Sequence, residues 1–256
     1  MTMFQIIAIP AFEDNYIWSY CQPDNAYCVL VDPGDGDAAQ DFLTRHNKQL
    51  CAVLITHHHH DHTGGIALLR QKWPGLRVIG PDSDKPIEGL TERVTEQQHV
   101  EIDQMALGFD VIAVPGHTLD HIAFYSAPVL FCGDTLFSAG CGRLFEGSAG
   151  QMWASLQKIM ALPDDTLLYC THEYTLANIR FAKSAEPDNA NLSAYESHCL
   201  TLRANNQPTL PALLANEKKI NPFLRCNNKT LQLNWQQDSA LALFAALRKA
   251  KDSFNA

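Results

Sequence analysis

An apolar run that leads straight into a cluster of histidines constrains this chain more than any other feature. Cys51–Ile55 has the composition of a buried strand, and Thr56-His-His-His-His-Asp-His-Thr-Gly-Gly65 follows it without a break. A helical pattern begins directly after the two glycines. Rigid elements on both sides of a loop hold its side chains in place, so imidazole and carboxylate groups gathered there suit a metal site.

The spacing within this segment predicts which side chains share an ion. In an extended loop, residues two apart point the same way, so His57 and His59 can bind one ion. Asp61 and His62 lie beyond a short bend and can face a second ion. Imidazoles with a carboxylate suit zinc, iron or manganese, and the chain has no Cys-x-x-Cys pair for a closed structural zinc site.

The intervening histidines, His58 and His60, alternate with the proposed ligands and are expected to point away from the ions. The main alternative is an exposed histidine tract that binds metal loosely. Such tracts are seldom flanked by a core strand and a Gly-Gly pair, which favours a built site.

Three more loops carry a histidine or an aspartate directly after a predicted strand, at His117, Asp134 and His172. Each residue alone is weak evidence, because a polar side chain after a strand is more often a cap or a satisfied core group. Together with the histidine segment, they indicate four loops at one edge of packed sheets, and seven of the 11 histidines fall in these loops.

Short strands with a few interleaved helices are predicted up to Thr171, which favours two packed sheets with helices outside. The expected strands are 4–9, 16–20, 27–31, 51–55, 77–79, 109–114, 122–125, 129–132 and 167–170, and the expected helices are 37–47, 65–72 and 151–161. Beyond Thr171 the pattern is helical, with helices expected at 174–185, 190–206, 211–219 and 239–251, and Asp238 is expected to cap the last.

Charge is distributed unevenly along the chain. The net charge of −9 argues against general binding to nucleic acid or anionic membrane, and no apolar run has the length of a spanning helix. Up to Thr171 there are 9 Lys and Arg against 21 Asp and Glu, whereas from His172 onward there are 10 against 7. A basic second part beside an acidic, metal-binding first part is the functional interpretation, and two unlike surfaces without function are the alternative.

The eight cysteines and the first residues favour a soluble cytoplasmic protein. Several cysteines lie in apolar strand patterns, where a thiol behaves as a small hydrophobic group, so buried free thiols are expected rather than disulfides. The segment from Met1 to Asp14 has no basic stretch ahead of an apolar run, so a secretory leader is not expected.

These motifs resemble those of a known family. His57-x-His59-x-Asp61-His62 followed by His117, Asp134 and His172 resembles the metallo-β-lactamase superfamily. Within it, Gly-Asp134-Thr-Leu-Phe-Ser-Ala-Gly-Cys-Gly-Arg143, His172-Glu-Tyr174-Thr and the ends of the chain resemble the hydroxyacylglutathione hydrolases, or glyoxalase II. The resemblance implies an α+β fold, an αββα metallo-β-lactamase-like sandwich at 1–171 that is the metal-binding catalytic domain. It implies a smaller α-helical glutathione-binding domain at 172–256.

The resemblance also implies a reaction and a set of site residues. The enzyme would be a thioesterase that cleaves S-D-lactoylglutathione to glutathione and D-lactate with a hydroxide bridging two divalent ions, most simply zinc, although iron and manganese also suit the ligands. A first ion would be held by His57, His59 and His117, a second by Asp61, His62 and His172, with Asp134 bridging, so that Asp61 and Asp134 are also the catalytic carboxylates. Glutathione would contact Arg143, Phe145, Tyr174, Arg248 and Lys251.

Two positions depart from the family pattern. Phe145 stands where the family often has tyrosine, so a hydroxyl contact is lost, and Asp120 stands where glycine is common. The partner implied is a small glutathione thioester, with no nucleic acid, no membrane and a monomeric chain expected.

Other functions compete with this one. A mononuclear-iron persulfide dioxygenase would keep the fold but should lack a full second metal site, whereas Asp61, His62 and His172 are all present. A metal-binding module without catalysis predicts a coordinatively closed site, whereas seven ligands for two ions leave positions open. A lactonase, β-lactamase or nuclease of the same superfamily leaves the basic C-terminal helices unexplained.

Overall fold

The computed structural model describes residues 4–254, which divide into two compact units. The first unit contains the described residues up to Ala113 together with Asp120–Gly133. The second contains Val114–Leu119 and the described residues from Asp134 onward. This division reflects compactness, and the functional boundary expected after Thr171 stays a prediction.

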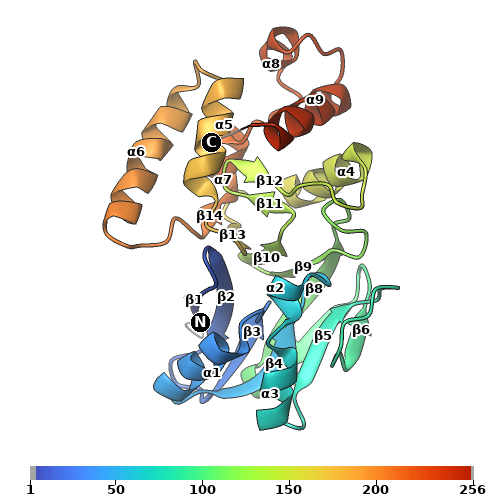
Figure 1. The fold of residues 1–256 in the computed structure, drawn as a ribbon, viewed down its shortest axis with the longest axis vertical. Helices are drawn as coiled ribbons and strands as arrows, with labels where there is room; N and C mark the ends of the chain where they lie inside the picture. Colours follow the sequence, from blue (N-terminus) through green and yellow to red (C-terminus); the bar gives the residue numbers. More distant parts are fainter. Residues whose placement is uncertain (1–3, 255–256) are drawn as a thin grey trace. The chain divides into compact units, whose positions relative to one another are not determined.

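The first unit contains a six-stranded sheet in which the strands follow chain order (Figure 1). The first three strands are antiparallel, and the third to the sixth are parallel. Parallel neighbours need a crossover connection. In the chain, α1 (Gly36–Arg45) lies between the third and fourth strands, and α3 (Ile66–Lys72) lies between the fourth and fifth. The strands are β1 (Gln5–Ala11), β2 (Asn15–Cys21), β3 (Tyr27–Val31), β4 (Gln49–Leu54), β5 (Arg77–Pro81) and β6 (Glu92–Val94).

A second group of strands in this unit is antiparallel throughout, in the order β10-β9-β8-β7. The short helix η1 (Asp103–Met105) connects the first two of them in the chain. The strands are β7 (His99–Ile102), β8 (Leu107–Ala113), β9 (Ile122–Ser126) and β10 (Val129–Gly133).

The first sheet is buried on both faces. Alternate residues of each strand point to opposite sides, so each face contributes its own set of side chains to a core. On one face, Leu30 of β3 belongs to a core that also contains Phe42 of α1 and Leu69 of α3. On the other face, the ring of Tyr20 lies 6.0 Å from that of Phe109 and 6.5 Å from that of Phe131, both in the second sheet. Two packed sheets with helices outside, as the sequence predicts, are therefore confirmed.

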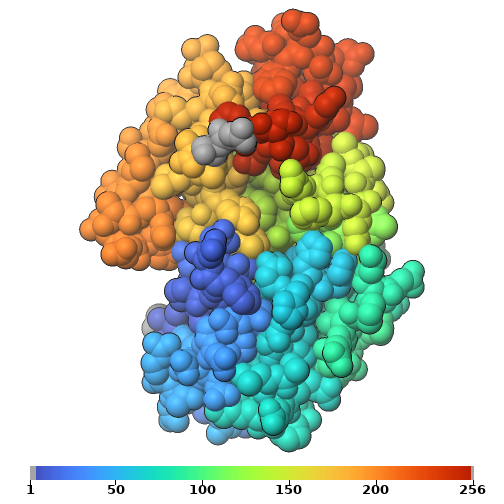
Figure 2. Space-filling view, in the orientation of Figure 1, coloured from blue at the N-terminus to red at the C-terminus, as the bar shows by residue number. Residues whose placement is uncertain are grey.

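The second unit is mainly helical, which confirms the change of pattern after Thr171. The α6 helix buries only Leu192 and Cys199, and Figure 2 shows it in orange at the surface. The elements of this second unit are β11 (Leu136–Phe137), β12 (Gly140–Cys141), α4 (Ala149–Met160), β13 (Leu167–Cys170), α5 (Thr175–Ala185), α6 (Ala190–Ala204), β14 (Ala212–Leu213), α7 (Leu214–Ile220), α8 (Lys229–Asn234) and α9 (Ala240–Asp252).

Aromatic and apolar side chains hold these helices together. The rings of Phe181 and Phe223 stack at 5.9 Å, and Phe244 of α9 lies 5.8 Å from both Phe223 and Trp153 of α4. Fully burying side chains of this size stabilises a fold by about 1.5–3 kcal/mol each.

Two local predictions in the helical part are wrong. The N-cap of α9 is Ser239 rather than Asp238, because the Ser239 side chain is the one that accepts a hydrogen bond from the N–H of Ala242, at 3.2 Å. The helix expected from Pro211 begins only at Leu214, since Ala212 and Leu213 pair with β13 as the short strand β14.

Several short elements have no counterpart among the sequence-based predictions, namely β6, β7, the β11–β12 pair, α2 (His60–Thr63) and α8. Segments of two to six residues contain too little periodicity to predict from the sequence. All eight cysteines are buried, and none of them forms a disulfide, as expected. In the part of the chain that the structure describes, no helix is both long and apolar enough to cross a membrane.

Candidate metal centre

The histidine segment begins at the end of β4, where the backbone is already part of the core. Thr56 and His57 are fully buried, and the Thr56 carbonyl accepts a 2.9 Å hydrogen bond from the N–H of Ile122. Nε2 of His57 lies 3.0 Å from Nδ1 of His59. Two nitrogens bound to one tetrahedral zinc ion at about 2.0–2.1 Å lie about 3.3 Å apart, so this pair has a spacing that one ion can bridge.

The bend expected before Asp61 and His62 is the helical turn α2. Oδ2 of Asp61 lies 3.5 Å from Nε2 of the buried His62, which again suits ligands of one ion better than a direct hydrogen bond. The same oxygen accepts a 3.0 Å hydrogen bond from Nδ2 of Asn15, at the start of β2. Asn15 thus orients this carboxylate, a role that the sequence does not reveal.

Asp32, just after β3, controls the orientation of two of the imidazoles. It is buried, and it accepts from the Thr56 N–H at 2.8 Å and from the Thr56 hydroxyl at 2.7 Å. Its Oδ2 also lies 3.0 Å from Nδ1 of His62. This carboxylate forms an ion pair with His62 when the imidazole is protonated, and Nε2 is the ring nitrogen of His62 that lies 3.5 Å from Oδ2 of Asp61.

The same network fixes His57. The Thr56 hydroxyl gives its only proton to Asp32, so the oxygen 3.1 Å from His57 Nδ1 accepts the ring proton. Nε2 is then left as the ring nitrogen that could bind a metal ion. A second ring nitrogen that donates to a carboxylate, carbonyl or hydroxyl is the usual support of a ligating histidine.

The turn after β3 reaches this network because one position adopts an unusual backbone conformation and another lacks a side chain. Asp32 has a φ of +51°, a left-handed conformation that aspartate adopts more readily than most residues. At Gly34, a Cβ atom would lie 1.8 Å from the backbone oxygen of Asp61. The sequence marks Asp32-Pro-Gly as a turn, and the structure shows that the turn is packed against the metal-ligand loop.

The ligands predicted in the second unit gather around Asp134, which follows β10. Its Oδ2 lies 3.5 Å from Nε2 of His117 and 3.3 Å from Nε2 of His172. All three side chains are buried. One carboxylate oxygen near two imidazole nitrogens is the arrangement expected of a carboxylate that serves more than one ion.

His117 also has a fixed tautomer. Its Nδ1 donates a 2.8 Å hydrogen bond to the carbonyl of Arg143, so Nε2, the atom nearer Asp134, carries the lone pair. Close packing supports the loop, because a Cβ atom at Gly142 would lie 1.9 Å from the Asp134 carbonyl oxygen.

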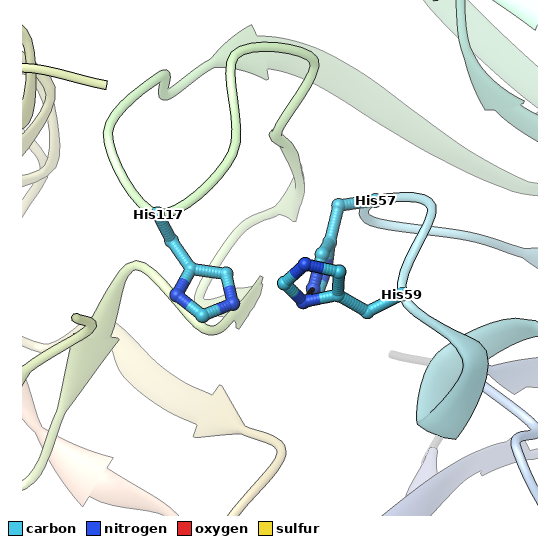
Figure 3. Close-up of side chains that lie close together, drawn as sticks. All are labelled: His57, His59 and His117. Atoms are coloured by element: carbon cyan, nitrogen blue, oxygen red, sulfur yellow. Dashed lines mark hydrogen bonds between the residues drawn. The ribbon is translucent and has the colours of Figure 1, made fainter. Parts of the chain in front are cut away.

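Within residues 4–254, four groups of three side chains could each hold a metal ion, with one ligand atom from each residue and all three atoms within 4.8 Å of one another. All seven predicted ligands occur in these groups. Figure 3 shows the rings of the first group turned toward one another. The groups are His57, His59 and His117; His57, His62 and Asp134; Asp61, His62 and His172; and His58, Asp120 and Glu146.

The histidines expected to point away have other surroundings. Nδ1 of His58 lies 3.0 Å from both carboxylate oxygens of Asp120, and His60 is exposed. Asp120, which departs from the family pattern, thus forms an ion pair with His58 when that imidazole is protonated.

Comparison with known proteins shows the family of the chain. Residues 16–172 match the metallo-beta-lactamase superfamily, and residues 173–254 match the C-terminus of hydroxyacylglutathione hydrolase. Proteins named hydroxyacylglutathione hydrolase from Chromohalobacter salexigens and Aliivibrio salmonicida are 50% and 49% identical to the chain, and each alignment covers 98% of this chain and 100% of the relative. The chain belongs to the hydroxyacylglutathione hydrolase family. It is a metal-dependent hydrolase.

Solved structures share the fold. The B3 metallo-beta-lactamase BLEG-1 aligns with a TM-score of 0.56 at 26% identity, over 66% of this chain and 91% of that one. TTHA1623 in a di-iron-bound form aligns with a TM-score of 0.55 at 25% identity over the same shares. ETHE1 from Myxococcus xanthus has a TM-score of 0.64 at 24% identity, over 97% of this chain and 98% of that one, which shows similarity of fold.

Two aromatic residues predicted to contact glutathione in this family lie beside predicted ligands. The ring of Tyr174 stacks on His172 at 4.6 Å, and that of Phe145 lies 5.2 Å from His117. Tyr174 is 37% exposed and Phe145 61% exposed, so both present accessible faces to a ligand.

The predicted basic contacts are linked through Asp252 of α9. Its Oδ1 accepts from Arg248 at 3.0 Å and from Arg143 at 3.3 Å. Arg248 is buried and also donates to the Cys141 carbonyl at 2.7 Å. Burial, with a contribution from Arg248, lowers the pKa of Lys251 to about 8.

Proposed function

We propose that the chain hydrolyses S-(2-hydroxyacyl)glutathione, with S-D-lactoylglutathione as the substrate and glutathione and D-lactate as products, the second step of methylglyoxal removal. The observation that carries the proposal is the set of imidazole and carboxylate ligands at spacings of 3.0–3.5 Å, in a chain that also has the basic C-terminal part of this family. The two relatives described above are named hydroxyacylglutathione hydrolase, and each alignment covers the whole relative.

The ligand assignment is part of the proposal. His57, His59 and His117 hold one ion, Asp61, His62 and His172 hold the other, and Asp134 bridges them. The donor set fits two divalent ions, because the tautomers of His57 and His117 leave Nε2 available, Nε2 of His62 lies 3.5 Å from Asp61, and TTHA1623, a structural relative, is described in a di-iron form. Zinc suits the set best, although iron and manganese also fit.

When bound, the ions supply Lewis acidity at the thioester carbonyl and lower the pKa of water toward neutrality. The protein residues do the rest. Asn15 and Asp32 keep Asp61 and His62 in one orientation, so no rearrangement is needed during the reaction. The chain needs no nucleophilic serine or cysteine, and a thiolate leaves readily with little proton donation.

Substrate recognition is assigned to the basic and aromatic residues of the second unit. Glutathione carries carboxylates, which Arg143, Arg248 and Lys251 would bind through charge-assisted hydrogen bonds. Tyr174 and Phe145 would provide apolar contact beside the thioester. We also propose that the protein is a soluble cytoplasmic monomer, as the sequence predicts.

The decisive experiment measures thiol release from S-D-lactoylglutathione together with metal content on one sample. We expect rapid release, about two ions per chain and complete loss of activity with a chelator. A D-lactoyl thioester of a small thiol that lacks the glutathione carboxylates is the matched control, and its KM should be at least tenfold higher. A protein with one iron per chain and no thiol release would refute the proposal in favour of a dioxygenase.

A further inference from the structure

A two-stranded hairpin in the second unit connects the candidate ligand Asp134 to Arg143. β11 and β12 pair through Leu136 with Cys141, and Ser138 and Ala139 form the turn. The Phe137 ring lies 5.9 Å from that of His172 and 5.4 Å from that of Tyr174, edge to face in both cases. The position of this hairpin therefore affects the rings of His172 and Tyr174 at the candidate site.

The far side of the hairpin is also tied to the proposed glutathione contacts. The carbonyl of Cys141, at the end of β12, accepts the 2.7 Å hydrogen bond from the buried Arg248. Movement of the hairpin would displace the partners of Tyr174 and Arg248 together.

The hairpin turn is held by a fully buried carboxyl group, Glu217 of α7. One oxygen of Glu217 accepts from the Ser138 hydroxyl at 2.8 Å, and the other accepts from the Ala139 N–H at 2.8 Å. Ala139 has a φ of +55°, which is unfavourable for alanine, so this hydrogen bond supports a strained turn. Asn221 links the same carboxyl to the hairpin, since its Nδ2 donates to Glu217 at 3.1 Å and to the carbonyl of Gly140 at 3.0 Å.

We propose that Glu217 is a positioning residue for glutathione recognition, which acts by holding the β11–β12 hairpin against Tyr174, His172 and Arg248. The inference rests on the proposed function for the identity of the ligand. The hydrogen bonds of Glu217 go to Ser138, Ala139 and Asn221, so its effect passes through the Ser138–Ala139 turn.

The network can keep its geometry whether Glu217 is charged or neutral. Burial raises the pKa of Glu217 to about 7, so both forms are populated near neutrality. The titratable groups that face it are Tyr195 and Cys199 of α6, whose own pKa values burial raises. A proton on the oxygen near Ser138 would donate to the Ser138 hydroxyl, which lies 2.9 Å from the Tyr195 hydroxyl and can donate onward.

This geometry makes glutamine a faithful replacement for the neutral form. In Glu217→Gln, the amide oxygen can accept from Ala139 and Asn221, and the amide nitrogen can donate to Ser138. Glu217→Ala removes all three contacts. Comparing the two variants therefore separates loss of the hydrogen bonds from loss of charge.

We expect Glu217→Ala to raise the KM for S-D-lactoylglutathione at least fivefold, with kcat within about twofold and metal content unchanged, because the predicted metal ligands lie outside residues 136–141. Glu217→Gln should keep the wild-type KM within about twofold across neutral pH. Hydrogen exchange of the 136–141 segment should be faster in the alanine variant only. Ser138→Ala, which removes a single contact, should give an intermediate KM and serves if Glu217→Ala does not fold.

Glu186→Ala is the matched control, since it breaks the ion pair with Arg225 in the same unit without touching the hairpin. It should lower stability and leave KM unchanged. An unchanged KM in both Glu217→Ala and Ser138→Ala, or an equal rise of KM in Glu186→Ala, overturns the inference. If wild-type protein releases no thiol from this substrate, the proposed function has failed, whereas the hydrogen-exchange comparison still tests the hairpin.

Discussion

Replacing Asp32 by asparagine tests whether the network behind the histidines sets metal affinity. The carboxylate of Asp32 accepts hydrogen bonds from the Thr56 N–H at Oδ1 and from the Thr56 hydroxyl at Oδ2, and this Oδ2 also lies 3.0 Å from His62 Nδ1. Asparagine has one oxygen, so in its best orientation this oxygen keeps the Thr56 hydroxyl contact and the approach to His62, and the NH2 group turns toward the Thr56 N–H. The left-handed backbone at Asp32 does not oppose the change, because asparagine tolerates that conformation.

The size of the effect follows from that one lost contact. A buried donor left unsatisfied costs about 1–3 kcal/mol, and loss of an outer partner of a metal ligand typically weakens metal binding about 10–100-fold. We therefore expect Asp32→Asn to raise the metal dissociation constant about tenfold to a hundredfold, with the larger loss at the site that contains His62.

The assay is competition with a chromophoric chelator on the purified protein. The control is Asp35→Asn, which makes the same change of charge three residues away. Asp35 accepts from Ala38 N at 3.0 Å as the N-cap of α1, and asparagine caps a helix equally well, so metal affinity should not change. Equal metal affinities for Asp32→Asn and Asp35→Asn would refute the reasoning.

Four further predictions follow from the site and its surroundings. Asp134→Ala should lower kcat/KM by more than about a hundredfold, whereas His58→Ala should lower it by less than about tenfold, and equal losses would contradict the ligand assignment. Burial raises the pKa of Glu217 to about 7, so the stability contributed by its protonated form is present at low pH and is lost as pH rises through that value. Between about pH 5.5 and about pH 8, urea unfolding should show that the free energy of unfolding of wild type falls by about 2 kcal/mol relative to that of Glu217→Gln. The pKa of Lys251 is about 8, so KM should rise from pH 7 to pH 9 in wild type and stay level in Lys251→Arg, and parallel KM profiles would argue against Lys251 as a substrate contact. Phe145→Tyr restores a hydroxyl and should lower KM about threefold in steady-state assays, whereas a higher KM would mean that no acceptor lies in reach.

The sequence predicted the ligand loops because strand ends and polar residues are both local signals. An apolar run followed at once by His or Asp places that side chain at the edge of a sheet, and all seven predicted ligands fall in the groups that could hold a metal ion. The elements that were missed are short. β11 and β12 have two residues each, so no periodicity marks the hairpin that Glu217 holds.

The supporting residues could not be predicted in the same way. Nothing in the sequence marks Asp32 or Asn15 as a partner of the ligand loop, because their hydrogen bonds to Thr56 and Asp61 span 24 and 46 residues and leave no local pattern. Glu217 lies in the helix that the sequence predicts at 211–219, and a charged residue in such a helix is normally assigned to the solvent side. Only its burial against Ser138 and Ala139 reveals that it faces inward.

The sequence by itself thus determined the kind of site, since residue types and spacing specify which ligands follow which strands and so which ions and reactions they suit. The tertiary structure alone decided the tautomers of His57 and His117 and what holds the predicted ligand side chains in place. Tautomers and orientations depend on hydrogen-bond partners from distant strands and helices, and these partners come together only when the chain folds.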